Sequence, residues 1–348
     1  MTTEFERILQ AHLARYPLMG PQDCGKLAYQ SHFGPEHMIS DEGAMLHHLR
    51  EEWKQISADD PIRFPEDIGG GLCRFYLNHE EEKELAAQVL VKLFSMTEKT
   101  RETKRNGFED KLSALEKLPL SGMREWLAEY RAQGCPALRH SEVYREAYAP
   151  HYRLLKKEYA AAFPALLETA KLLERKGKAV VAIDGRCGCG KSTMGTLMGE
   201  VFSCNVFHMD DFYLPKDGRA ENWLEIPGGN MDLARFKREV LENVFAGRAV
   251  PYRPFDCSAG TLGKEVLTPP TQITVIEGSY SHHPALEAGY DLKIFVTSEK
   301  QTQLRRLRER EGDYFPTFER LWMPLEEQYI RLCAVEKGAE LVIDTGKI

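Results

Sequence analysis

The string GRCGCGKST at 185–193 constrains this chain more than any other feature of its sequence. It fits the pattern G-x-x-x-x-G-K-[ST] at Gly185, Gly190, Lys191 and Ser192, directly after the β-branched run AVVAIDG. The glycines let the backbone curl so that successive N–H groups point at one centre, and the helix that follows adds its positive N-terminus. The lysine of such a loop reaches the β- and γ-phosphates, and the serine hydroxyl binds Mg²⁺. The loop therefore predicts a site for ATP with Mg²⁺.

Short apolar runs and helical stretches alternate after this loop. The runs at 204–208, 272–278, 291–296 and 340–344 have the length and composition of buried strands. Strand, helix and strand at these intervals indicate βαβ units around a parallel sheet. We therefore predict an α/β fold for 173–348, a P-loop NTPase parallel sheet flanked by helices.

The N-terminal half has a different pattern, which is helical almost throughout. Helix starts are predicted at Thr3, where the sequence fits a capping box, at Pro21 and after Asn78. The segment 68–77, IGGGLCRFYL, is the one place where an extended or looped backbone is expected. We predict a mostly α-helical domain over 1–172, and its sequence does not indicate its role.

A stripe of tyrosines lies near the end of that half. Tyr144, Tyr148 and Tyr152 recur every fourth residue, although Pro150 should interrupt a helix that carries all three. We interpret the stripe as a packing face.

Composition excludes several classes of protein. The 348 residues carry a net charge of −7, which argues against a nucleic-acid binder. No apolar run approaches the roughly 18 residues that span a bilayer, and the N-terminus lacks the pattern of a signal peptide. The eight cysteines are scattered without zinc-type spacing, so reduced thiols are expected. We expect a cytoplasmic protein that binds neither nucleic acid nor membrane.

Two of those cysteines lie inside the phosphate loop. Near a helix N-terminus their thiols could have a lowered pKa and be sensitive to oxidation, or they could simply be small residues that the turn tolerates. Their backbone would contact phosphate in either case. The predicted nucleotide-binding residues are Gly185, Cys187, Gly188, Cys189, Gly190, Lys191, Ser192 and Thr193.

Acidic residues follow two of the predicted strands. Asp210 and Asp211 come just after 204–208, and Glu277 ends the next strand. The carboxyl ends of parallel strands meet at one edge of a sheet, beside the phosphate loop. One aspartate there can take the proton of a hydroxyl that attacks the γ-phosphate, and Glu277 with Ser192 can hold Mg²⁺. The aspartates could instead form a helix cap or a turn.

The segment 178–348 resembles the uridine kinase and phosphoribulokinase group of P-loop kinases. The resemblance is carried by five features in order: GRCGCGKST, DDFY, VPYRPFDCSAGTL, VIEGSY, and DLKIFV followed by an Arg-rich helix. It implies that Asp210 is the catalytic base and that Tyr213 lines the acceptor pocket. It also implies that Arg306 and Arg310 are lid arginines that act with Lys191 on the transferring phosphoryl group. A solvated helix face is the alternative for both arginines.

The resemblance is weaker in the acceptor region. The stretch NWLEIPGGNMD replaces the family's sugar-binding motif, and the hairpin lacks the family's usual histidine and basic pair. Trp322, Pro324 and Glu327 have no assigned role. The polar candidates that remain are Glu225, Asn230, Asp232, Arg253, Asp256 and Ser258, and the predicted substrate residues are Asp211, Tyr213, Arg253 and Glu225.

These features predict an ATP-dependent kinase that phosphorylates a hydroxyl of a small molecule, a nucleoside or a related metabolite. The alternative is an ATP-binding switch or ATPase whose helical domain is the effector. The helical domain could cap the acceptor pocket, form a homodimer or bind a second ligand. His140, Tyr144 and Arg145 are the residues we would test there first.

Overall fold

The structure is a computed structural model, and it describes residues 3–35, 41–100, 106–286 and 289–347. The chain divides into two compact units, and the boundary along the chain lies between Ala160 and Ala161. The division falls inside α8 (Lys157–Lys176), the helix that also contains the boundary predicted near residue 172. None of the helices in the described part of the chain combines the length and the apolar character needed to cross a bilayer.

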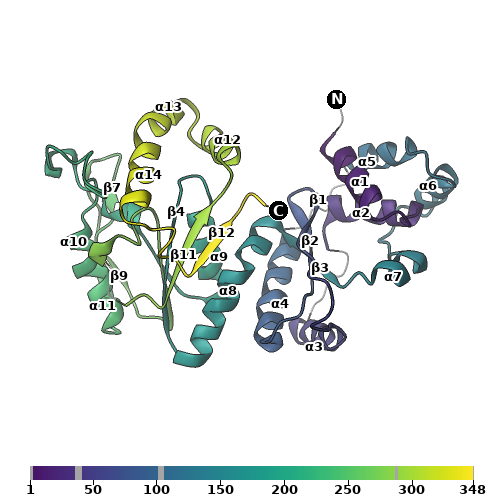
Figure 1. The fold of residues 1–348 in the computed structure, drawn as a ribbon, viewed down its shortest axis with the longest axis horizontal. Coiled ribbons are helices and arrows are strands. Elements are labelled where there is room, and N and C mark those ends of the chain that lie inside the picture. The colour runs from purple at the N-terminus through teal and green to yellow at the C-terminus, as the bar shows by residue number, and fades with distance from the viewer. Residues whose placement is uncertain (1–2, 36–40, 101–105, 287–288, 348) are drawn as a thin grey trace. The chain divides into compact units, whose positions relative to one another are not determined.

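Helices build most of the N-terminal unit (Figure 1). The predicted capping box forms, because the Glu6 amide donates to Thr3 Oγ1 and the Thr3 amide donates to the Glu6 carboxylate. Pro21 begins the second helix, as predicted. The helices are α1 (Glu4–Arg15), α2 (Pro21–Phe33), α3 (Glu42–Trp53), α4 (Lys83–Lys99), α5 (Phe108–Glu116), α6 (Met123–Ala132) and α7 (Glu142–Tyr148).

The predicted helix start at Asn78 is wrong. Helix α4 begins at Lys83. The Asn78 side chain instead pairs with the backbone of Arg63, accepting from its N–H at 2.8 Å and donating to its carbonyl at 2.9 Å. A residue far away in sequence therefore uses the side chain that could have capped the helix.

A small antiparallel sheet interrupts the helices of this unit. Its strands are β1 (Glu66–Gly69), β2 (Leu72–Tyr76) and β3 (Tyr152–Lys156), with β2 in the middle. The extended segment expected over 68–77 is thus confirmed. The tyrosine stripe is divided, because α7 ends at Tyr148, Ala149 adopts a left-handed conformation and Tyr152 begins β3.

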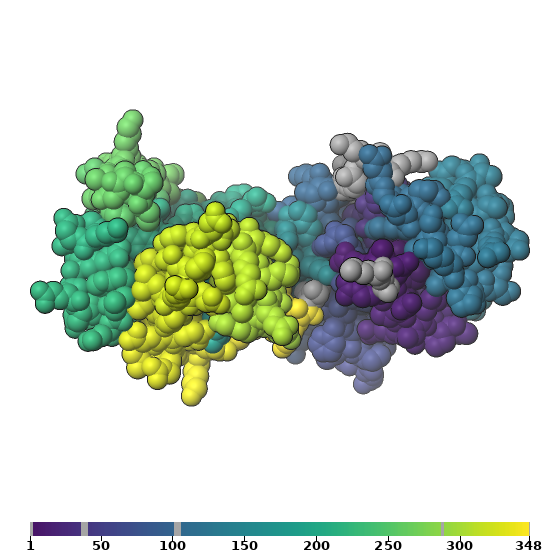
Figure 2. Space-filling view, turned by 90° about the horizontal axis from the view of Figure 1, so that it is seen from above, coloured from purple at the N-terminus to yellow at the C-terminus, as the bar shows by residue number. Residues whose placement is uncertain are grey.

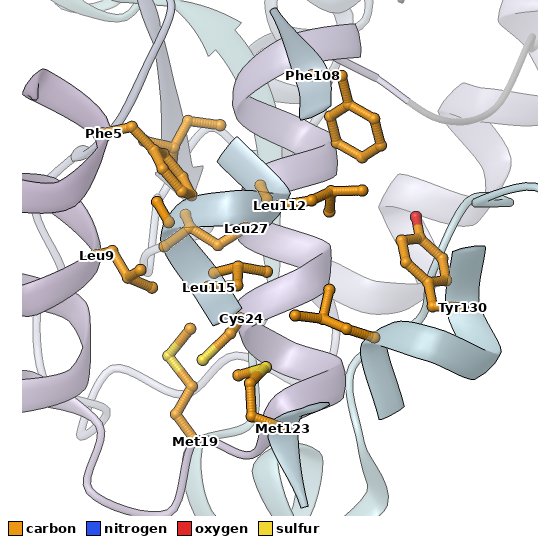
Figure 3. Packing of buried hydrophobic residues seen from close by; sticks show 14 of the residues in the cluster. Phe5, Leu9, Met19, Cys24, Leu27, Phe108, Leu112, Leu115, Met123 and Tyr130 are labelled. Carbon is orange, nitrogen blue, oxygen red and sulfur yellow. The ribbon is translucent and has the colours of Figure 1, made fainter. Parts of the chain in front are cut away.

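The core of the N-terminal unit lies between α1, α2, α5 and α6. Figure 3 shows their apolar side chains pointing into one cluster. Tyr144 is fully buried in the same cluster, and Tyr148 and Tyr152 pack against it, which confirms the stripe as a packing face. The labelled residues are Phe5, Leu9, Met19, Cys24, Leu27, Phe108, Leu112, Leu115, Met123 and Tyr130.

A five-stranded parallel sheet forms the centre of the C-terminal unit. Its spatial order is β12-β11-β4-β10-β5, and every neighbouring pair is parallel. The run AVVAIDG before the loop and the four runs predicted as strands after it all form strands of this sheet. The order places β4, which precedes the phosphate loop, at the centre and beside β10. The strands are β4 (Ala179–Gly185), β5 (Asn205–His208), β10 (Ile273–Glu277), β11 (Leu292–Thr297) and β12 (Leu341–Asp344).

Helices cover both faces of this sheet (Figure 1). On one face α9 (Lys191–Phe202) approaches closely, since a Cβ added at Gly195 would lie 3.4 Å from Val206 of β5. Phe207 points to the opposite face and packs in a cluster with Phe236 and Tyr329. These come from α10 (Leu233–Phe236) and α14 (Met323–Leu332). The parallel sheet is therefore buried on both sides.

Two further parts complete the C-terminal unit. The predicted hairpin forms two short antiparallel pairs, β6 (Val250–Tyr252) with β9 (Val266–Thr268) and β7 (Phe255–Asp256) with β8 (Thr261–Leu262). Figure 2 shows this light-green segment projecting from the surface. The same view shows the yellow segment from α12 (Lys300–Glu311) onward forming a broad part of the surface.

Candidate active site

The phosphate loop connects β4 to α9, as the sequence predicts. Gly188 and Gly190 have φ angles of 72° and 98°, a left-handed backbone that glycine adopts without strain. Lys191 is the first residue of α9, and its ammonium folds back to donate to the Gly185 carbonyl at 2.7 Å. The loop also lies tightly against α12, because a Cβ at Gly188 would lie 2.8 Å from Leu307.

Ser192 and Glu277 meet beside the loop. The Ser192 hydroxyl donates to Glu277 Oε2 at 3.1 Å, and Glu277 is buried at the end of β10. The neighbouring β5 aligns His208 with Glu277, and His208 Nδ1 lies 2.5 Å from the other carboxylate oxygen. This hydrogen bond raises the pKa of His208. Sequence reasoning missed His208, although it ends the strand that precedes the two aspartates.

The pair of Ser192 and Glu277 fits a Mg²⁺ site of the kind found with nucleotides. Within the described residues, no three His, Cys, Asp or Glu side chains group closely enough to hold a metal by themselves. Mg²⁺ in kinases is usually held by one or two protein oxygens together with phosphates and water. A hydroxyl and a carboxylate already in contact beside the loop supply that set.

Asp210 lies in the 3₁₀ turn η1 (Met209–Phe212) that follows β5. Its Oδ1 accepts a hydrogen bond from the Tyr213 hydroxyl at 3.0 Å. The side chain is accessible to solvent, yet protein surrounds much of it. The loss of hydration raises the pKa of Asp210, and the charges of Glu277 and Glu326 act in the same direction, while Tyr213 and Lys191 oppose them.

Asp211 contacts the hairpin. The Tyr252 hydroxyl donates to its Oδ2 at 3.4 Å, and the Arg235 guanidinium donates to its carbonyl at 2.8 Å. Burial raises the pKa of Asp211. The two aspartates therefore have separate environments, and Asp211 supports the hairpin instead of lining the cavity described below.

Glu326 of α14 is a site residue that the sequence did not reveal. Its Oε2 accepts a hydrogen bond from the Cys187 amide of the phosphate loop at 2.8 Å, and its Oε1 lies 3.7 Å from the Lys191 ammonium. The Ser279 hydroxyl donates to the same Oε1. The sequence offered one hint of Glu326, its place in the string WMPLEE at 322–327. From that string sequence reasoning named the neighbouring Glu327 instead.

Glu327 anchors the start of the loop. It accepts a hydrogen bond from Arg186 Nε at 2.7 Å, and Arg186 also reaches Thr297 and Glu336. Pro324 lies in the first turn of α14, which continues directly from the π-helical segment Phe318–Trp322. The helix thus holds the phosphate loop through two adjacent glutamates.

The two loop cysteines, Cys187 and Cys189, are buried and form no disulfide bond. Burial raises the pKa of both Cys187 and Cys189, so neither is a reactive thiolate. The Cys187 carbonyl accepts from the Gln303 amide at 2.9 Å, and Cys189 Sγ lies 3.1 Å from the Ser298 hydroxyl. The raised pKa values favour the second interpretation, in which the two cysteines are small residues that the turn tolerates.

A cavity of about 790 Å³ lies next to this site in the C-terminal unit. Glu326 and Ser279 line it, so the cavity reaches the group that contacts the phosphate loop. Tyr213 also lines it and connects it to Asp210. Much of its remaining wall is aromatic or polar, from Asn230, Phe255, Ser258, Tyr280, Tyr314, Phe318 and Trp322.

Besides Asp211, two further predicted substrate residues lie outside this cavity. Arg253 donates to the carbonyls of Gly263 and Leu262, so its guanidinium closes the exposed hairpin. Glu225 is exposed, and its carbonyl accepts from the Gln328 side chain. Neither the Arg253 side chain nor the Glu225 side chain lines the wall of the cavity.

The two predicted lid arginines have different surroundings on α12. Arg306 donates to the Thr345 hydroxyl at 2.8 Å and to its carbonyl at 3.0 Å, and that hydroxyl donates to the Cys189 carbonyl of the loop. Arg310 pairs with Glu311 and stacks over Phe318 of the cavity wall. In the described structure neither guanidinium contacts Lys191 or Asp210.

The sheet order, the loop after the central strand and the convergence of Lys191, Ser192 and Glu277 define the fold of a P-loop NTPase. No family model matches the sequence, and no curated protein matches it either.

Solved structures of similar fold cover about half of the chain. One is a "possible uridine kinase" from Bacillus stearothermophilus, 19% identical, which aligns with 54% of this chain and 100% of its own at a TM-score of 0.43. Another is a "putative fructose transport system kinase" from Silicibacter sp. TM1040, 23% identical, which covers 52% of this chain and 98% of its own at a TM-score of 0.39.

Proposed function

We propose that this chain is a small-molecule kinase that transfers the γ-phosphoryl group of ATP to an alcohol, with a nucleoside or a related metabolite as acceptor. The observation that supports this proposal most is the cavity beside the phosphate loop. Tyr213 on its wall leads to Asp210, and Glu326 on its wall contacts Cys187 and Lys191. An acceptor held there has a carboxylate near its hydroxyl and the phosphate loop within reach.

Asp210 is the proposed general base. The loss of hydration raises the pKa of Asp210, which makes its carboxylate a stronger proton acceptor than that of an ordinary aspartate. Tyr213 holds the carboxylate through a 3.0 Å hydrogen bond, which fixes its orientation. Lys191 would neutralise charge on the phosphoryl group, and Ser192 with Glu277 would hold Mg²⁺, which shields the phosphates when bound. Positioning and charge neutralisation supply most of the catalysis in such a reaction.

A panel of acceptors tests the proposal. Nucleosides, sugars, vitamins and amino alcohols are incubated with ATP and Mg²⁺, and acceptor-dependent ADP release is measured. We expect one class to stimulate ADP release. ATP hydrolysis that no acceptor stimulates, together with a change of shape on binding ATP, would favour the alternative of a switch.

Substitution of Asp210 tests the mechanism. Asp210→Asn removes the proton acceptor but keeps the size of the side chain, so kcat should fall by roughly 10²–10⁴-fold. The affinity for ATP, measured by calorimetry, should change little. Asp313→Asn is the matched control, because Asp313 is an exposed aspartate of the same unit that does not line the cavity. Full activity of Asp210→Asn on the true acceptor would show that another group is the base.

A further inference from the structure

A second cavity, of about 480 Å³, lies entirely within the N-terminal unit. Its wall carries four cationic side chains, Lys26, Arg139, Arg145 and Arg153, and none of the described residues that line it is an aspartate or a glutamate. The whole chain has a net charge of −7, so this concentration of positive charge is a local feature.

Two acidic groups of the described residues that contact lining residues of the cavity are already engaged. Glu52 binds Arg153 at 2.7 Å and His151 at 2.9 Å. Asp23 accepts from His140 and from Ser141 beneath the wall. Neither carboxylate interacts with Arg139 or Arg145.

Arg139 and Arg145 are therefore the two cations open to a ligand. Both are exposed, and among the described residues neither guanidinium has a hydrogen-bond or ion-pair partner. Arg139 comes from the segment before α7, and Arg145 from α7 itself. Guanidinium groups bind phosphate oxygens in pairs through their parallel N–H bonds.

Gln30 of α2 places an oriented amide on the same wall. The residue is buried, at 4% exposure, and lines the cavity. Its Oε1 accepts hydrogen bonds from Tyr152 and Arg74, which orients the amide. Among the described residues no hydrogen bond engages Gln30 Nε2, so this donor is available to a ligand.

The remaining walls limit the kind of ligand. Pro35, Phe94 and Leu154 are apolar, and Tyr152 presents an aromatic ring. The volume lies in the range of roughly 300–1,000 Å³ that small-molecule sites occupy, which is larger than a phosphate ion needs. A phosphate ester offers two negative charges and three acceptor oxygens, whereas a carboxylate offers one charge.

We propose that this cavity binds a small phosphorylated molecule, with its phosphate on Arg139 and Arg145 and its body against Gln30 and the apolar wall. The inference does not depend on phosphoryl transfer in the other unit. It gives the N-terminal unit a ligand-binding role.

Calorimetry with inorganic phosphate tests the proposal on the full chain carrying Lys191→Met, which weakens phosphate binding at the loop. Phosphate should bind, and acetate should bind at least tenfold more weakly. Arg139→Gln with Arg145→Gln should weaken phosphate binding at least tenfold. The matched control is Arg7→Gln with Arg124→Gln, which removes the same charge from two exposed arginines of the same unit and should change nothing.

Hydrogen exchange of the unsubstituted chain gives a second measurement. It does not use Lys191→Met, so it tests the proposal even if that variant does not fold. Phosphate should slow exchange in peptides that cover 26–30 and 139–154, and this protection should disappear in the Arg139→Gln, Arg145→Gln variant. Absence of phosphate binding, equal binding of acetate, or equal losses in the two double variants would overturn the proposal.

Discussion

At the scale of single residues, Glu326 of α14 contacts the same donors of the phosphate loop that a phosphate would use. Glu326 binds the Lys191 ammonium and the Cys187 amide, which are donors of the kinds that such a loop presents to phosphate. A phosphate at the loop would share these donors with the Glu326 carboxylate. Glu326 thus links α14 to the phosphate loop.

The loop cysteines provide a prediction at the same scale. Cys187 and Cys189 are buried and their pKa values are raised, so both should react slowly with iodoacetamide near neutral pH. Cys257 is exposed on the hairpin and serves as the internal control. Mass spectrometry of the digested protein should find Cys257 labelled well before the loop peptide. Equal labelling of the loop and of Cys257, or loss of ATP affinity after peroxide treatment, would restore the redox hypothesis.

At the scale of elements, the junction of β4 with the loop depends on close packing against β11. Gly185 has a φ of 143°, and a Cβ there would lie 2.0 Å from the Val296 carbonyl. Gly185→Ala should therefore lower the free energy of unfolding of the C-terminal unit by about 1–3 kcal/mol, the usual cost of overpacking. It should also weaken ATP binding, because the loop starts at this residue.

Urea unfolding and nucleotide titration measure the two effects. Gly177→Ala is the matched control, since Gly177 also has a positive φ, of 69°, but nothing lies within 4 Å of an added Cβ. The control carries the cost of the backbone conformation without the clash. If the two variants lost the same stability, close packing of β4 against β11 would not be the cause.

At the scale of the whole molecule, the N-terminal unit should be sensitive to acid. Burial lowers the pKa of His140 to about 4, and the charges of Arg74 and Lys26 add to this, while its hydrogen bond to Asp23 opposes it. Tyr152 hydrogen-bonds its other ring nitrogen. An unfolded histidine titrates near 6.5. As the pH falls from 6.5 toward 4, the unfolded state gains a proton that the folded state does not, so stability is lost at about 1.4 kcal/mol per pH unit.

Urea unfolding between pH 7 and pH 4 measures this loss. Trp223→Phe and Trp322→Phe leave Trp53 and Trp126 as reporters, both in the N-terminal unit. His140→Gln should flatten the pH dependence, although burial also lowers the pKa of His12 and leaves part of it. His79→Gln, at an exposed position, should leave the slope unchanged. An unaltered slope in His140→Gln would show that His140 is not the group responsible.

The sequence by itself was sufficient to predict the features that depend on residues close together in the chain. The loop with Lys191 and Ser192, the five parallel strands and the capping box at Thr3 follow from local conformational preference and from runs of apolar residues. The placement of Glu277 beside Ser192 also followed, because parallel strands bring their carboxyl ends to one edge.

Only the tertiary structure decided the features that depend on partners distant in the chain. Asn78 failed as a cap because Arg63 binds its side chain, and Tyr152 joined a strand because β2 pairs with it. The sequence singled out His140 and Arg145, but it indicated neither the cationic cavity that they line nor the role of Glu326, because the groups involved come from separate segments that meet only after folding. Local preference acts over a few residues, whereas a site requires groups that packing brings together.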